Sequence, residues 1–315
     1  MKRAAIAAQH RVSKPYRRLS TAVFETLADG SIGENLLILP CNRVVRVMDF
    51  DQDATTVCIR PGFSAEFMLK DIALRSDDQQ APFHKILAFS DDGSWLQEEL
   101  VDGRPLFRAT RDPDALGRWM LETLAVLETW QTASARRVDA RCYVNALVNR
   151  IQAGFQESRA ATRCALSTLP NGLLGSAKKA AASSPELLLV QGHRDLSPKN
   201  VIIRRDTGRP VILDWELSDE SFQYFDRMCL GLGALDLLPE PGLELRLQRF
   251  LSARDDNEFL RALPTDGAWR ALAGGVFALE LVCWLLHMMD DYSGAYATEL
   301  EACLNSLHRV DWAKG

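Results

Sequence analysis

The segment 193–200 carries the densest group of side chains that could do chemistry. It reads His-Arg-Asp-Leu-Ser-Pro-Lys-Asn, and a short apolar run follows it. Asp195 and Asn200 lie five residues apart, and a second apolar run leads to Asp214. The turn residues Asp206-Thr207-Gly208 separate the two runs and predict a hairpin. Because a hairpin returns the end of its second strand to the start of its first, we expect Asp195, Asn200 and Asp214 to converge.

Two carboxylates and one amide oxygen suit a hard divalent cation together with a base. Magnesium takes a few oxygen ligands from protein, keeps several waters, and uses substrate phosphates for the rest. Phosphoryl transfer needs little more from a protein than positioning and charge neutralisation. The segment therefore predicts a phosphoryl-transfer site, and the alternative is an ordinary hairpin with polar turns.

The wider pattern resembles a kinase catalytic loop. HxDLxxxN is followed 14 residues after its asparagine by an aspartate at a strand end. The second motif reads Asp214-Trp215-Glu216 rather than DFG, and only 12 residues separate Asp214 from Asp226, which leaves no room for an activation loop. These features resemble the aminoglycoside phosphotransferase and choline kinase superfamily of small-molecule kinases. The segments 42–47 and 95–106 are similar to the second strand and the interlobe connection of that family.

The resemblance implies ATP and Mg2+ as cofactors and gives roles to the matching residues. Asp195 would accept or orient the proton of the substrate hydroxyl as it attacks the γ-phosphate. Asn200 and Asp214 would hold magnesium. His193 would bond within the loop, and Asp226 would brace it.

The resemblance also implies a nucleotide site in the N-terminal part. The third strand of the family usually holds a lysine, and this chain offers Arg60, whose guanidinium can bond two phosphate oxygens. Asp71 would be its ion-pair partner, with Glu66 as the alternative. Backbone groups at 98–100 would meet adenine, and Ser197 would bond a phosphate oxygen or tie the loop. The implied nucleotide-site residues are Arg60, Asp71, Asn42, Glu98, Leu100 and Ser197.

Acidic residues near or after the second motif are candidates for the acceptor side, namely Glu216, Asp219 and Glu280. Glu280 lies inside the apolar run 271–289, where a charge must be paired or face a cavity. A buried salt bridge is the alternative for Glu280, and a loop-bracing hydrogen bond is the alternative for Glu216.

Hydrophobic periodicity predicts an α+β chain with a small sheet lobe and a larger helical lobe, and the resemblance implies a bilobal protein-kinase-like fold. An N-terminal lobe over 1–105 would hold an N-terminal helix and an antiparallel sheet. A larger, mainly helical lobe over 106–315 would hold the catalytic loop and the substrate site. The predicted strands are 36–39, 44–48, 55–59, 85–89, 95–100, 187–191, 201–203 and 211–213, and helices are predicted from Ser64, from Pro113, over 140–166 and beyond 222. The small residues of 172–185 predict a loop or a frayed helix end.

Composition narrows the class of protein. The 315 residues include 47% hydrophobic and 25% charged residues, as in globular proteins, and the net charge of −5 argues against a nucleic-acid partner. Seven dispersed cysteines suit a reducing cytoplasm. The apolar run 271–289 approaches the length of a membrane span, but Glu280 and two glycines favour a buried helix.

The sequence therefore predicts an enzyme that moves the γ-phosphate of ATP to a hydroxyl of a small molecule. An aminoglycoside or another antibiotic is the first expectation for the acceptor, which would give resistance by O-phosphorylation. Choline, another amino alcohol or a sugar is the alternative. A kinase-like binding protein without turnover is an alternative of another class, and a protein kinase is a third.

Overall fold

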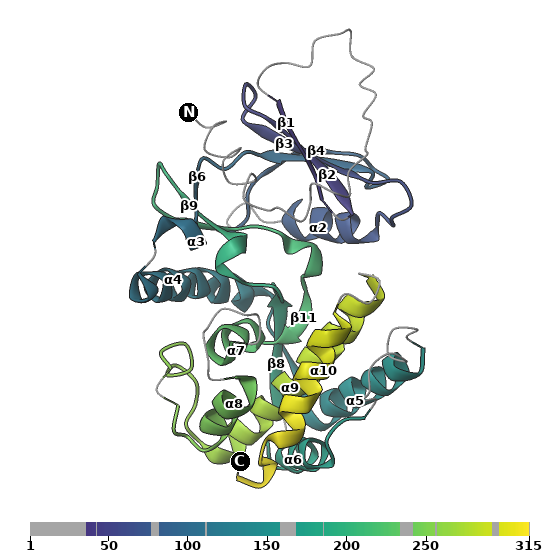
Figure 1. Cartoon of the computed structure of the whole chain (residues 1–315), viewed down its shortest axis with the longest axis vertical. Helices are drawn as coiled ribbons and strands as arrows, with labels where there is room; N and C mark the ends of the chain where they lie inside the picture. The colour runs from purple at the N-terminus through teal and green to yellow at the C-terminus, as the bar shows by residue number, and fades with distance from the viewer. Residues whose placement is uncertain are drawn as a thin grey trace. The chain divides into compact units, whose positions relative to one another are not determined.

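The computed structural model describes residues 36–41, 43–76, 82–110, 112–157, 168–184, 186–233, 242–255, 257–291 and 296–314. The chain forms two compact units (Figure 1). The first unit comprises residues 1–126 and 198–217, and the second comprises 127–197 and 218–315. The first unit thus continues beyond the lobe predicted over 1–105 and takes in a later segment. The predicted N-terminal helix lies outside the described residues.

A five-stranded antiparallel sheet forms the frame of the first unit, in the order β1-β2-β3-β5-β4. Its strands are β1 (Leu36–Pro40), β2 (Val44–Asp49), β3 (Ala54–Ile59), β4 (Ile86–Phe89) and β5 (Trp95–Glu99). They confirm the five strands predicted in this part of the chain. In the register of β2 and β3, Arg46 lies opposite Val57.

Helix α2 (Glu66–Ser76) covers one face of this sheet. The amide of Glu66 donates to Ser64 Oγ at 3.2 Å, which satisfies one free donor of the first turn. Met68 and Ile72 of the helix pack into a core with strand residues Val44, Val57 and Leu96. The alternation of side chains along a strand therefore puts Arg46 on the same face of β2 as Val44, the face that α2 covers.

A smaller sheet completes the first unit. It contains β6 (Gly103–Pro105), β9 (Val201–Arg204) and β10 (Pro210–Ile212), in the order β10-β9-β6. The strands β9 and β10 confirm the predicted hairpin, whereas β6 was not predicted because three residues with a proline carry no strand periodicity. The short α3 (Leu106–Ala109) follows β6, and α4 (Pro113–Gln131) begins at the predicted proline.

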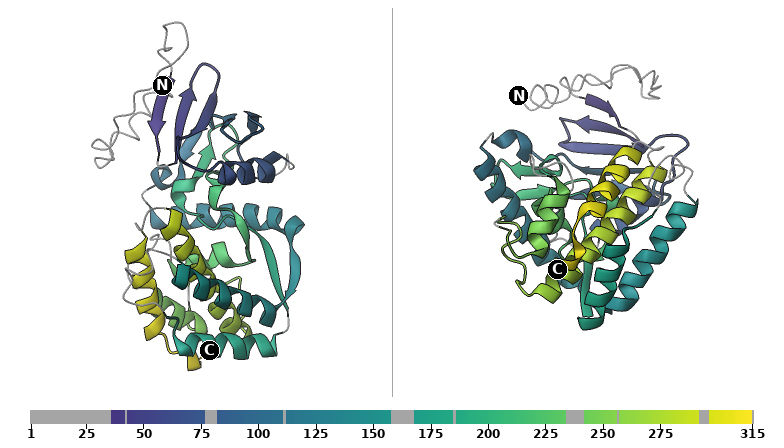
Figure 2. Two further views of the ribbon diagram at one scale, coloured as in Figure 1. Left: turned by 90° about the vertical axis from the view of Figure 1, so that its right-hand side faces the viewer. Right: turned by 60° about the horizontal axis from the view of Figure 1, so that its bottom comes forward.

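The second unit is built around α9 (Gly267–Asp291), as Figures 1 and 2 show. It packs against α5 (Ala140–Glu157), α6 (Asn171–Ser183), α8 (Leu243–Leu251) and α10 (Ala297–Arg309). Helix α9 is long and apolar enough to cross a membrane, but 94% of its most apolar 18-residue window is buried by the protein. This burial is that of a core helix, as the sequence predicts.

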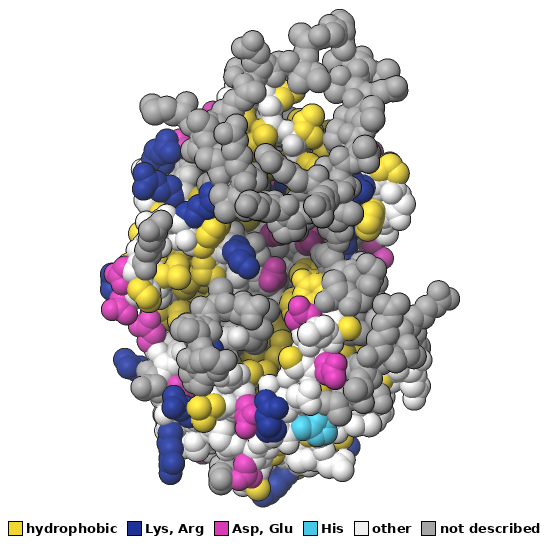
Figure 3. Space-filling model, in the orientation of Figure 1, with side chains coloured by type: hydrophobic (Ala, Val, Ile, Leu, Met, Phe, Trp, Pro, Cys, Tyr) yellow, Lys and Arg dark blue, Asp and Glu magenta, His cyan; other side chains and the backbone are white. Residues whose placement is uncertain are grey.

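A second three-stranded sheet, in the order β11-β8-β7, lies within this unit beside α7 (Phe225–Leu232). Its strands are β7 (Arg136–Asp139), β8 (Glu186–Gly192) and β11 (Asp219–Phe222). Only β8 was predicted, since β7 and β11 are four residues long and rich in charge. On the face shown in Figure 3, acidic and basic side chains are interspersed over the described part of the surface.

A loop or a frayed helix end was predicted over 172–185, but a regular helix, α6, occupies Asn171–Ser183. Its small residues allow close packing on α9: a Cβ added to Gly275 would lie 2.9 Å from Ala177 Cβ. Burial of Leu173, Ala177 and Ala181 against α9 therefore compensates for the weak helix propensity of the two glycines.

Candidate active site

The predicted catalytic loop belongs to the second unit up to Ser197 and is held by one carboxylate. Asp226, near the start of α7, accepts the backbone amides of His193 at 2.8 Å and Arg194 at 2.7 Å. His193 is fully buried, and its Nδ1 accepts the amide of Asp195 at 3.2 Å. Burial raises the pKa of Asp226, while His193 and the two amides act against that rise. Asp226 therefore fixes the backbone just before Asp195.

Two residues of the predicted site adopt left-handed backbone conformations. Arg194 has φ 67° and Asp214 has φ 66°, and among the described non-glycine residues only Asp53 and Ala253 share a positive φ. Such conformations cost free energy and persist where the surrounding structure enforces them. At Arg194 the enforcing contacts include the Asp226 carboxylate and the ring of Phe225, whose centroid lies 5.7 Å from the guanidinium carbon. The turn at Arg194 directs the backbone into Asp195.

Asn200 and Asp214 lie at the same end of the β9–β10 hairpin in the first unit. Ile212 pairs with Val201, and the amide of Leu213 donates to the carbonyl of Asn200 at 2.8 Å. The side chain of Asp214 keeps 38% exposure, so it can still reach a ligand. An amide oxygen and a carboxylate oxygen are the donors that Mg2+ accepts together with waters and phosphates, so these two residues fit that ion. Within the described ranges, no group of three or more His, Cys, Asp or Glu side chains has metal-binding geometry.

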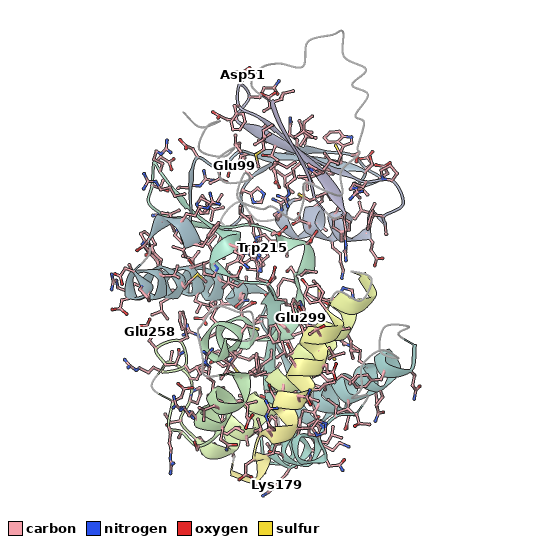
Figure 4. All side chains as sticks on the ribbon, in the orientation of Figure 1. Asp51, Glu99, Lys179, Trp215, Glu258 and Glu299 are labelled. Atoms are coloured by element: carbon pink, nitrogen blue, oxygen red, sulfur yellow. The ribbon has the colours of Figure 1, made fainter. Side chains whose placement is uncertain are left out.

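Arg46 of β2 joins this end of the hairpin to the five-stranded sheet. Its Nη2 donates to Asp214 Oδ1 at 3.1 Å, and its Nη1 lies 3.6 Å from Glu98 Oε1. The three side chains line one pocket of the first unit together with Glu216 and Trp215, which is labelled in Figure 4. Asp214 and Glu98 were predicted as site residues from the sequence, whereas Arg46, whose guanidinium lies between them, was not.

Glu98 is held from its other side by α2 and by the segment before β4. Arg75 Nη2 donates to Glu98 Oε2 at 3.1 Å and to Asp71 Oδ2 at 2.8 Å, and His84 Nε2 contacts the same Glu98 oxygen. Burial alone would raise the pKa of Glu98, but His84, Arg46 and Arg75 outweigh it and hold that pKa well below its ordinary value. Glu98 is therefore a permanent anion that orients Arg46. We call these six residues, Arg46, Asp71, Arg75, His84, Glu98 and Asp214, the first-unit charge cluster.

The predicted ion pair of Arg60 with Asp71 is wrong. Arg60 is exposed and donates to the carbonyl of Cys41 at 3.2 Å, whereas Asp71 pairs with Arg75. The reason is the alternation of strand residues: Arg60 follows β3 at a position that does not share the face of Val57. Asn42 lies outside the described residues. The amide of Leu100 donates to the carbonyl of Asp53 at 2.7 Å, so this donor is not available for adenine, and the side chain of Glu98 lines the pocket of the first unit.

The remaining candidates occupy varied positions. Ser197 is buried, with 6% exposure, as the last residue before the chain re-enters the first unit. Glu216 lines the pocket of the first unit. Asp219 lies on β11, is 51% exposed, and pairs loosely with Arg194 at 3.5 Å.

Glu280 is not an exposed acceptor ligand. It is 2% exposed in α9, and its Oε1 accepts the Tyr143 hydroxyl and the amide of Phe222, each at 2.7 Å. Among the described residues, none forms a hydrogen bond with the buried Oε2. The structure shows neither the predicted exposed acceptor ligand nor the predicted buried salt bridge at this residue. Instead, the Glu280 carboxyl links α9 to α5 and β11 through two hydrogen bonds.

Comparison with solved structures identifies the fold. A thermostable mutant of aminoglycoside phosphotransferase APH(4)-Ia, in a ternary complex with AMP-PNP and hygromycin B, matches with a TM-score of 0.50 at 13% identity, over 87% of this chain and 94% of that chain. The chain has the fold of aminoglycoside phosphotransferase APH(4)-Ia. A choline/ethanolamine kinase family protein from Mesorhizobium loti matches with a TM-score of 0.49 at 16% identity, over 90% of this chain and 92% of that chain. No protein-family model and no curated protein matches the chain.

The charges of the first unit differ from those that the sequence predicted for the nucleotide site. The strand β3 contains neither lysine nor arginine, and the cation in the pocket comes from β2. The acid that orients this cation comes from β5, while α2 contributes a buried arginine. Two signals in the sequence could have found these residues. Arg46 lies two residues after the buried Val44 and so shares its face of β2. Arg75 continues the spacing of Met68 and Ile72 along the buried face of α2.

Proposed function

We propose that the protein is an ATP- and Mg2+-dependent phosphotransferase that moves the γ-phosphate to a hydroxyl of a small molecule. The observation that carries the proposal is that Asn200 and the left-handed Asp214 lie at the same end of the hairpin. Asp214 also accepts a hydrogen bond from the Arg46 guanidinium. Two oxygen donors next to a cation suit a polyphosphate and its metal. The fold of small-molecule phosphotransferases supports the same class of reaction.

Each residue has a separate task in this proposal. Asn200 and Asp214 would hold the magnesium ion, which neutralises phosphate charge when bound. Asp195, whose amide is fixed by His193, orients the acceptor hydroxyl and accepts its proton as the oxygen attacks phosphorus. Asp226 keeps that loop in place through the two amides that it accepts.

The acceptor that we propose is a small hydroxylated compound, and an aminoglycoside or another antibiotic is its first candidate. The neighbour APH(4)-Ia was solved with hygromycin B. An amino alcohol such as choline, or a sugar, is the second candidate. The six cysteines that the described ranges contain are free thiols, which supports our proposal of a cytoplasmic location.

The test measures ADP release from Mg–ATP with a panel of aminoglycosides, nucleoside antibiotics, choline and sugars. Wild type should turn over at least one compound, and Asp195→Asn should lower kcat by about 10²–10⁴-fold, the range for loss of a general base. Asp206→Asn is the matched control, because Asp206 is exposed in the turn of the same hairpin and bonds the adjacent amide of Thr207. Equal activity of wild type and Asp195→Asn would refute the assigned role of Asp195.

The competing hypothesis is a kinase-like binding protein without turnover. The ion pair between Arg46 and Asp214 motivates it, since this pair occupies a carboxylate that a metal needs. The two hypotheses differ in one observable. The binding protein would take up Mg–ATP in calorimetry but release no ADP with any acceptor, and failure to bind Mg–ATP at millimolar concentration would exclude the enzyme.

A further inference from the structure

We propose that Arg46 of β2 is the phosphate-binding cation of the nucleotide site, in place of a lysine on the third strand. This inference rests on the proposed function, because it assumes that a nucleotide binds beside Asp214. The sequence predicted this role for Arg60, at the end of β3. The inference assigns it instead to Arg46, which lies on β2 and on the opposite face of the sheet.

The strand register explains how the cation can change strands. Arg46 lies directly opposite Val57, and paired residues on neighbouring strands have Cβ atoms about 5 Å apart on the same face. A long side chain from β2 therefore reaches the volume that a side chain from position 57 would enter. Val57 is buried, and β3 carries no basic residue over its six positions.

The surroundings of Arg46 are those of a cation kept ready for an anion. Glu98 holds Nη1 at 3.6 Å, and Glu98 itself is fixed by Arg75 at 3.1 Å. The other nitrogen, Nη2, meets the half-exposed Asp214 at 3.1 Å. The Arg46 side chain retains 27% exposure, so its end is open to a ligand. Nη1 thus lies near the buried Glu98, while Nη2 donates to Asp214, a carboxylate that a nucleotide site would use.

A planar guanidinium can serve both partners at once. Its five donors let Nη1 stay on Glu98 while Nη2 turns from Asp214 to a phosphate oxygen. That exchange frees the Asp214 carboxylate and keeps the positive charge of Arg46 within the pocket. The Arg46–Asp214 pair therefore holds both side chains in place before the nucleotide arrives.

Arg60 does not share these surroundings. It is exposed, and its Nη1 donates to a backbone carbonyl of Cys41 at 3.2 Å. It follows the end of β3, three residues after Val57, so strand alternation puts it on the other face. Arg60 consequently serves as a matched control for removal of an arginine from this sheet.

The experiment compares wild type, Arg46→Gln, Arg46→Val, Arg60→Gln and the exchange Arg46→Val/Val57→Lys. Mg–ATP affinity is measured by calorimetry, and ADP release with the best acceptor gives kcat; thermal melting confirms that each variant is folded. Arg46→Gln should weaken Mg–ATP binding by about 10–100-fold, as expected for one charge-assisted hydrogen bond, and Arg60→Gln should change it by less than about 3-fold. The exchange should recover at least half of the lost binding free energy relative to Arg46→Val, because it returns a cation to the same volume from β3.

The outcomes separate this inference from the proposed function. If wild type binds and turns over Mg–ATP and Arg46→Gln does so equally well, the role of Arg46 is refuted and the function stands. If Arg60→Gln alone loses binding, the cation is Arg60. An exchange no better than Arg46→Val would also overturn the inference, because the loss would then reflect a damaged sheet. If wild type binds no Mg–ATP, both the function and the inference fall.

Discussion

Glu98 in the first unit and Glu280 in the second are both almost fully buried, yet burial has opposite outcomes for their charge. Glu98 contacts Arg75 and His84 and lies near Arg46, and its pKa falls well below the ordinary value. Glu280 accepts a tyrosine hydroxyl and one backbone amide, and burial raises its pKa to about 7 although the charge of Arg194 and both hydrogen bonds act against that rise. Direct contact with cations, rather than depth, therefore decides whether a buried acid stays charged. The first arrangement suits a site that meets polyphosphate, and the second suits a joint between helices.

The largest expected effect is that of Glu98→Gln. It leaves Arg75 and Arg46 without their shared counter-charge, and loss of one partner from a buried ion pair costs about 3–5 kcal/mol of unfolding free energy. Urea unfolding at pH 7 measures this loss. Because the folded pKa of Glu98 is lowered, its contribution is present above pH 4.5 and disappears as the pH falls toward the lowered value, so the variant should approach wild type in strong acid.

The neighbouring Glu99→Gln is the control for that measurement. Glu99 pairs with Arg204, and both side chains are about one-quarter exposed, at 26% and 25%. A partly exposed pair contributes about 1 kcal/mol or less. A loss for Glu98→Gln no larger than the loss for Glu99→Gln would remove the distinction between buried and exposed acids in this unit.

Glu280→Gln should produce the next effect, and its sign is opposite. A carboxyl whose folded pKa is raised from 4.5 to about 7 favours folding when it is protonated, so the stability of wild type falls as the pH rises through that interval. Glutamine keeps the oxygen that accepts from Tyr143 and Phe222 and carries no charge. The variant should match wild type near pH 4, below the ordinary pKa of 4.5, and exceed it by about 3 kcal/mol at pH 8. Parallel curves of unfolding free energy against pH would contradict this assignment.

Asp226→Asn should cost about 2 kcal/mol and lower kcat more than it changes Mg–ATP affinity. An asparagine offers one carbonyl where the carboxylate accepts two amides, so one buried donor loses its partner. The measurement pairs chemical unfolding with a separation of kcat from Kd. The matched control is Asp219→Asn, because Asp219 is 51% exposed on β11, where it accepts the adjacent amide of Glu220 and lies 3.5 Å from the Arg194 side chain. Equal losses of kcat and of nucleotide affinity would show general damage instead of a displaced loop.

The smallest effect should come from Arg136→Gln on the surface of the second unit. Arg136 pairs with Glu220, and the two side chains are 57% and 40% exposed. Solvent screens such a pair, so we expect no resolvable change in melting temperature. A clear shift would mean that exposure alone does not separate strong from weak ion pairs in this protein.

The sequence predicted the elements that depend on local pattern. Asp195, Asn200 and Asp214 could be placed on one loop and one hairpin because turn residues and short apolar runs define that hairpin without knowledge of its neighbours. The positions of Asn200 and Asp214 at one end of the hairpin follow the prediction, while their chemical roles stay predictions.

What the sequence could not supply depends on contacts between distant segments. The position of Arg46 in the first-unit charge cluster depends on the register of β2 against β3, which puts Arg46 opposite Val57. Glu280 accepts a hydrogen bond from the backbone amide of Phe222 in β11, and this strand was too short to predict. The composition of α6 predicts a loop or a frayed helix end, but the helix forms because Ala177 can approach Gly275 closely. In each case the deciding partner lies more than ten residues away along the chain.

The first unit is discontinuous in the sequence, since residues 198–217 return to it after 71 residues, 127–197, that belong to the second. A ribosome therefore releases most of the first unit long before β9 and β10 exist to complete it. Until then, β6 lacks its neighbour β9, and Arg46 lacks Asp214. Contacts of such high sequence separation carry a large loop-closure cost and slow folding. A fragment ending near residue 126 would consequently be an incomplete domain, and dissection of this protein should begin from chains that extend at least to Leu217.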